Sequence, residues 1–132
     1  MALGRQGHEQ QVHFLHRVVN YNDTGVGSGV VVGILPAGAQ ITGILVVIDT
    51  AFNAATTNNL LLGTAAAGNQ IATTSDTAAG TAGAKVVTTG LALAEPTADQ
   101  AIYATYTQTG TAATAGKARV AISYVYNTSL YN

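Results

Sequence analysis

The stretch AQITGILVVIDT at residues 39–50 decides the fold class of this chain. Its residues are mostly β-branched or leucine, which favour extended backbone. In a strand, the isoleucines and the valine at positions 44, 46 and 48 lie on one side, and Leu45 and Val47 lie on the other. A strand that is apolar on both sides is either central in a sandwich or covered on its outer face by a neighbouring subunit.

Outward from this stretch, further runs are short, rich in β-branched or aromatic residues, and bounded by Gly, Asn or Asp. The predicted strands are 12–21, 30–35, 39–50, 60–64, 70–72, 86–94, 101–109 and 117–126. The last two alternate most clearly, and the loop at 110–116 predicts that they form a hairpin. No convincing amphipathic helix is present.

The chain is therefore predicted to be all-β, with a single β-sandwich or jelly-roll domain at 12–132. The expected architecture has about seven to eight antiparallel strands, and residues 1–11 are expected to form an extended N-terminal arm. The apolar segment 26–48 contains Pro36 in a turn sequence, so two strands explain it better than a membrane helix. The polar segment 1–11 lacks the apolar stretch of a secretory signal.

The composition points to an assembly component. The 132 residues include 24 alanines, 19 threonines and 15 glycines, but only five Lys and Arg and six Asp and Glu. Soluble domains usually have about a quarter of their residues charged, whereas only 8% are charged here. Such a surface is easily dehydrated, so we expect copies of the chain or another protein to cover it. The absence of a basic patch disfavours nucleic-acid binding, and the absence of cysteine excludes disulfides.

The N-terminal region holds the one cluster of potential metal ligands, namely His8, Glu9, His13 and His16. In a strand at 12–21, His13 and His16 point to opposite faces and cannot bind one ion within a subunit. We interpret them as solvated or interface residues, although three copies around a symmetry axis could each contribute one histidine to a site. We expect no resident metal and no cofactor.

Catalytic patterns are not found. Five carboxylates lie at or near expected turns, where Asp and Glu have structural roles; they are Asp23, Asp49, Asp76, Glu95 and Asp99. Ser28 lacks the G-x-S-x-G elbow of a nucleophile. We expect the protein not to be an enzyme.

Tyrosines are concentrated near the end of the chain. Tyrosine suits both protein interfaces and sugar-binding surfaces, and cross-strand packing is the simplest interpretation. Together with the arm and the histidines they form the predicted interface with a partner or with other subunits, which comprises Arg5, His8, Glu9, His13, His16, Tyr103, Tyr106, Tyr124 and Tyr126.

Three short motifs carry a resemblance to known proteins: ILPAGAQI at 34–41, VVIDTAFN at 46–53 and LLLGT at 60–64. Together with ARVAISY at 118–124 they resemble small structural proteins of tailed bacteriophages, of the capsid decoration (cement) type. The resemblance covers 18–126 and names no catalytic residues to carry over.

The resemblance implies a β-sandwich or jelly-roll module that forms dimers or trimers on an icosahedral shell. The expected partner is the major capsid protein, and the expected location is the outer surface of the virion, after assembly in the host cytoplasm. A protein of this type bridges and stabilises capsomers. The alternative is a tail-fibre or head-fibre module that binds a host receptor or glycan through the loop at 110–116.

Overall fold

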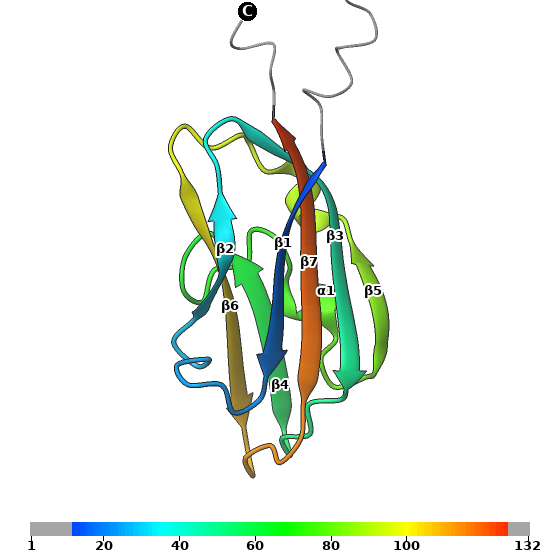
Figure 1. Cartoon of the computed structure of the whole chain (residues 1–132). Coiled ribbons are helices and arrows are strands. Elements are labelled where there is room, and N and C mark those ends of the chain that lie inside the picture. The colour runs from blue at the N-terminus through cyan, green and yellow to red at the C-terminus, as the bar shows by residue number, and fades with distance from the viewer. Residues whose placement is uncertain (1–11, 127–132) are drawn as a thin grey trace, which may run out of the picture.

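The computed structural model describes residues 12–126, which form two packed antiparallel sheets (Figure 1). The strands are β1 (His13–Asn20), β2 (Val30–Leu35), β3 (Ala39–Thr50), β4 (Thr57–Gly63), β5 (Gly83–Val87), β6 (Gln100–Thr109) and β7 (Lys117–Tyr126). Two single-turn helices, α1 (Thr74–Thr77) and the 3-10 helix η3 (Thr89–Ala92), flank β5.

The strand order is that of a jelly roll with one strand missing. One sheet has the order β1-β7-β3-β5 and the other has the order β2-β6-β4. β1 pairs with β7, β2 with β6 and β3 with β5, so the first three strands pair with the last three in reverse order. β4 lies between these two halves in the sequence. The prediction of an all-β sandwich is confirmed.

The predicted strand at 70–72 is wrong. Ala72 forms an isolated bridge with Leu62 of β4, where an eighth strand of a jelly roll would lie. The ladder stops there because Thr73 is the N-cap of α1, so the chain turns away from the sheet. Within the described residues the sandwich therefore has seven strands.

Two other predicted boundaries differ from the structure. The predicted strand at 86–94 is displaced: β5 covers Gly83–Val87, and the chain then coils into η3. Gly90 lets η3 pack closely on the core, because a Cβ at this position would come within 2.7 Å of Ile44 and 2.8 Å of Ile71. In addition, β4 begins at Thr57, inside a segment that reads as a polar loop.

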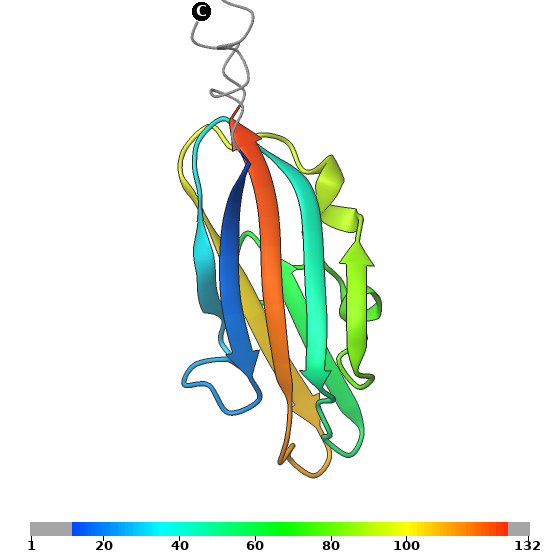
Figure 2. The same ribbon diagram turned by 45° about the vertical axis from the view of Figure 1, so that its right-hand side comes forward.

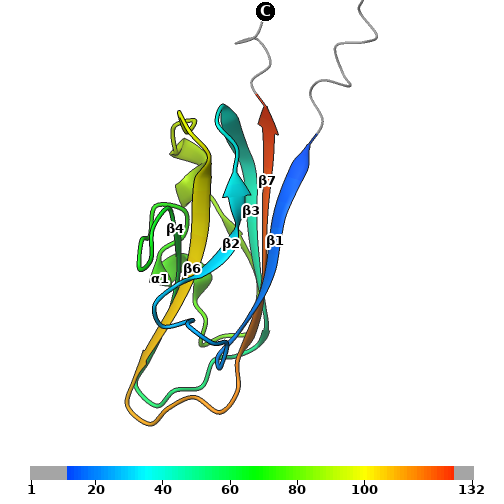
Figure 3. The same cartoon turned by 60° about the vertical axis from the view of Figure 1, so that its left-hand side comes forward.

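The predicted hairpin between the last two strands is also wrong, because β6 and β7 belong to different sheets. The loop at 110–116 crosses from one sheet to the other (Figure 3). Asn53 holds this loop from the β3–β4 connection: the Thr114 and Ala115 amides donate to its Oδ1 at 2.8 and 3.0 Å. β6 therefore pairs with β2 and β4, and β7 pairs with β1 and β3, all of which are distant from them in the sequence.

The core lies between the inner faces of the two sheets. On β3, a bulge between Ile41 and Gly43 shifts the alternation, so that Ile44, Val46 and Ile48 also point inward. The largest fully buried side chains are Phe52, Leu35, Ile48, Leu60, Leu62, Ile71, Ile102, Ile122, Val19, Val46, Val87 and Val120.

The start of β1 and the end of β7 lie side by side at one end of the sandwich, where His13 pairs with Tyr124 (Figure 1). The helices at residues 12–126 are too short to cross a membrane.

Candidate docking surface

The outer face of the four-stranded sheet is the strongest candidate for a functional site, and Figure 2 shows this sheet facing the viewer. The strands β1, β7, β3 and β5 run across it in that order. Side chains that alternate outward from them meet no second layer within the described residues.

A groove of about 260 Å³ lies on this face. Its lining is Phe14, Gly43, Ile44, Leu45, Val86, Ala121 and Ser123. We call these seven residues the sheet groove. Three of them are large apolar side chains left open to solvent: Phe14 is 67% exposed, Val86 is 81% exposed and Leu45 is 39% exposed.

The floor of the sheet groove consists of small residues in register across two strands. Ser123 of β7 pairs with Gly43 of β3, and Ala121 pairs with Leu45. The Ser123 hydroxyl is hydrogen-bonded to the Thr42 hydroxyl at 3.0 Å. A Cβ on Gly43 would come within 2.8 Å of the Ser123 hydroxyl oxygen. Glycine at this position therefore leaves the floor of the groove without a side chain there.

The walls of the sheet groove come from the two outer strands of the sheet, β1 and β5. Phe14 pairs with Ser123 from the β1 side, and Val86 of β5 pairs with Leu45 from the β5 side. Tall apolar walls beside a floor of small residues make a hollow that accepts a protruding side chain. The groove therefore has a shape that complements a convex surface.

An ion pair lies on this face beside the groove, at the next outward position of β7 after Ala121. Arg119 of β7 donates to both carboxylate oxygens of Asp49, at 2.8 and 3.0 Å. The hydrogen bond from Arg119 holds the pKa of Asp49 below its ordinary value, and the same bond raises the pKa of Arg119. The two charges neutralise each other, so neither is left without a counter-charge beside the groove.

The sheet groove is lined by apolar and small side chains. Its lining has no carboxylate, imidazole, amine or thiol, and the Ser123 hydroxyl has no base among the lining residues. Among residues 12–126, no three His, Asp or Glu side chains gather closely enough to hold a metal ion.

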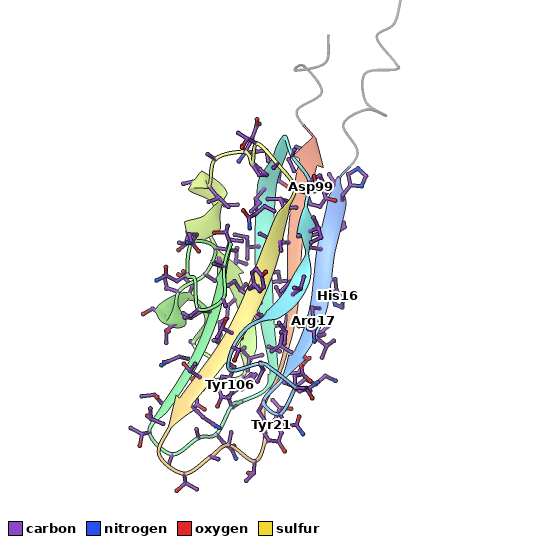
Figure 4. All side chains as sticks on the ribbon, turned by 90° about the vertical axis from the view of Figure 1, so that its left-hand side faces the viewer. His16, Arg17, Tyr21, Asp99 and Tyr106 are labelled. Carbon is purple, nitrogen blue, oxygen red and sulfur yellow. The ribbon has the colours of Figure 1, made fainter. Side chains whose placement is uncertain are left out.

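The two predicted histidines lie on opposite sides of β1, as the alternation of a strand requires. The His13 ring is partly buried and stacks on the Tyr124 ring, with 5.5 Å between centroids. His16 is exposed on the outer side, opposite Ala121 of the groove floor (Figure 4). A partner contact by either residue stays a prediction.

The predicted tyrosines divide between core and surface. Tyr106 is 3% exposed, its ring packs on Phe52 at 4.6 Å, and its hydroxyl donates to Asn58 at 2.6 Å (Figure 4). Burial raises the pKa of Tyr106. Tyr124 is 8% exposed. Both side chains fill the interior of this chain, which leaves them little surface to offer a partner.

Tyr103 is partly exposed on β6, beside the edge strand β2, where it pairs with Val31. Its predicted interface role stays a prediction. The predicted contacts of Arg5, His8 and Glu9 fall outside the described residues, as does the side chain of Tyr126.

Phe14, Leu45 and Val86 did not enter the set of residues predicted from the sequence. The sequence did contain one signal for Leu45. The segment 39–50 has a second apolar face that includes Leu45, and such a face indicates a central strand or an outer surface covered by a neighbouring subunit. The companion residues come from β1, β5 and β7, so only the sheet order brings them beside Leu45.

No protein-family model matches this sequence, and a comparison with curated proteins gives no match. Solved structures do match. A chain of the capsid asymmetric unit of cyanophage Pam1 is 26% identical, with a TM-score of 0.71 over 89% of this chain and 86% of that one.

Two further structures share the fold. A chain of the acidic stable capsid of Helicobacter pylori bacteriophage KHP30 is 13% identical, with a TM-score of 0.64 over 88% of this chain and 89% of that chain. A chain of the capsid of Ralstonia phage GP4 is 15% identical, with a TM-score of 0.64 over 89% and 84%.

All three of these structures are phage capsids, and each match spans most of both chains. The resemblance to phage structural proteins predicted from the sequence is confirmed. The likeness to the cyanophage Pam1 chain, at 26% identity, supports a viral capsid protein located in the virion, whereas the other two structures share the fold.

Proposed function

We propose that this protein is a capsid decoration (cement) protein, which binds the outer surface of a phage head and bridges and stabilises neighbouring capsomers. The observation that carries the proposal is the likeness to a chain of the cyanophage Pam1 capsid, at 26% identity over 89% of this chain. In this proposal the partner is the major capsid protein, the protein acts as a dimer or trimer, and it joins the shell in the host cytoplasm.

The mechanism is mechanical. A shell under internal DNA pressure is weakest where capsomers meet, so a small protein that bridges them adds buried area at each junction. A stable interface buries on the order of 1,600 Å² in total, and several smaller contacts made together reach the same strength through multivalency. The apolar sheet groove and the low charge of the chain suit such burial.

Purified protein mixed with undecorated shells of the parent phage tests the proposal. We expect the protein to sediment with the shells, to saturate at a fixed ratio, and to give symmetry-ordered density on the outer surface. Decorated shells should also withstand a higher temperature before they release DNA. Protein that stays in the supernatant at high concentration would overturn the proposal, and selective binding on a glycan array would then favour the fibre alternative.

A further inference from the structure

We propose that the sheet groove is the face that contacts the shell, and that it receives an apolar side chain protruding from the major capsid protein. This inference rests on the proposed function and names the docking face and the chemistry of its partner. Three observations carry it: the shape of the groove, the size of the apolar patch around it, and the placement of the charges on the same sheet.

The shape calls for a convex partner. Gly43, Ala121 and Ser123 form a low floor, and Phe14 rises on one side of it. Val86, which is 81% exposed and pairs with Leu45, rises on the other side. A protruding aliphatic or aromatic side chain would fill the hollow and cover both walls.

The size of the patch argues against a free-standing dimer through this face. The lining spans four strands spaced about 4.8 Å apart and two rows of outward residues, which gives an area on the order of 300 Å². A stable two-protein interface needs about 800 Å² from each partner. A contact of this size holds only as one of several made together, as on a shell that binds many copies.

The charges indicate that the entering group is uncharged. The groove lining offers no counter-charge, and the nearby Arg119 and Asp49 already satisfy each other through two hydrogen bonds. A charged side chain buried in the groove would lose its hydration without a partner, which costs several kcal/mol. The groove therefore selects Leu, Ile, Val, Met or Phe at the tip of the protrusion.

Variants of the full chain test the inference on shells, with three readouts: shell affinity, the urea midpoint of unfolding and the mass in solution. Phe14→Ser and Val86→Ser remove apolar walls that are already exposed, so the urea midpoint should hardly move. We expect each to weaken shell binding at least tenfold. The matched control is Ile34→Ser, which removes a 50% exposed side chain from edge strand β2 of the other sheet and should change binding less than twofold.

A third groove variant separates the effect of groove shape from the effect of exposed apolar area. Ala121→Leu fills the floor of the groove while it adds apolar surface, and we expect it to weaken binding as strongly as Phe14→Ser does. Tighter binding by Ala121→Leu would overturn the proposed protrusion.

The outcomes distinguish this inference from the proposed function. If the wild-type protein fails to bind shells, both are overturned. If wild type binds and the groove variants bind equally well, only the docking face is wrong. If the groove variants shift the mass in solution but not the shell affinity, the occupant is a second copy of this chain, which also overturns the inference.

Discussion

Among the charged residues of the described chain, Asp76 connects two elements through its side-chain hydrogen bonds. The Thr73 backbone amide donates to its Oδ2 at 2.9 Å, and the Thr89 hydroxyl donates to the same oxygen at 2.6 Å. In return, the Asp76 amide donates to the Thr73 hydroxyl at 3.2 Å, which completes a capping box at the start of α1. The carboxylate thereby ties α1 to η3.

These bonds make the stability of the protein depend on pH. The Thr73 amide, followed by the Thr89 hydroxyl, lowers the pKa of Asp76 from its ordinary 3.8. A lowered pKa in the folded state means that the charged form stabilises the fold. That contribution is present above the ordinary pKa and is lost as the pH falls through the lower folded pKa.

We therefore expect Asp76→Asn to reduce the free energy of unfolding by about 1 kcal/mol at pH 7, because a neutral amide oxygen accepts these hydrogen bonds more weakly than a carboxylate does. The gap between wild type and variant should shrink as the pH falls below 3.8. Urea denaturation at several pH values measures this, with Ser75→Ala on the exposed side of the same turn as the control. A gap that stays constant down to pH 2 would contradict the assignment.

At the scale of the elements, the crossing from β6 to β7 depends on one close approach. Phe52, in the β3–β4 connection, is 1% exposed and lies directly under Gly116 at the end of the crossing loop. A Cβ on Gly116 would lie 2.5 Å from the Phe52 ring, and the backbone φ there is +154°. The loop can pass over the ring only because residue 116 has no side chain.

Gly116→Ala should therefore destabilise the protein through both backbone strain and overpacking. Gly25→Ala is the matched control, since Gly25 also has a positive φ, +81°, but an added Cβ meets nothing within 4 Å. We expect the control to cost about 1 kcal/mol from backbone strain alone, and Gly116→Ala to cost about 2 kcal/mol more through overpacking. Equal urea midpoints for the two variants would show that the Phe52 ring moves aside without a loss of stability, and would contradict the prediction.

At the scale of the whole molecule, the described core is built from residues between Leu15 and Tyr124. We accordingly predict that removal of residues 1–11 leaves the fold intact and weakens shell binding. The removed segment carries Arg5, His8 and Glu9, which could form charged contacts with a neighbour.

Two measurements check this prediction: the urea midpoint should change little, while co-sedimentation with shells should need a higher protein concentration. A truncated protein that decorates shells as well as the full chain would show that the predicted arm plays no part in attachment. A large fall in the midpoint would show instead that residues 1–11 belong to the folded domain.

Local sequence determined the fold class and most of the strands. Runs of β-branched residues at 39–50 and 117–126 can be extended whatever their neighbours are, because strand preference and two-residue periodicity are local properties. The opposite directions of His13 and His16 followed from the same periodicity. The resemblance to phage structural proteins also came from the sequence, and the likeness to solved phage capsid structures confirms it.

Only the tertiary structure decided which strands are neighbours, because pairing depends on the packing of side chains that are distant in sequence. It separated β6 from β7, reduced 70–72 to a bridge and buried Tyr106 and Tyr124. It also assembled the sheet groove from four strands, with a bulge in β3 that turns Leu45 outward. A sequence specifies the faces of each strand, but a surface built across strands exists only after the sheet order is set.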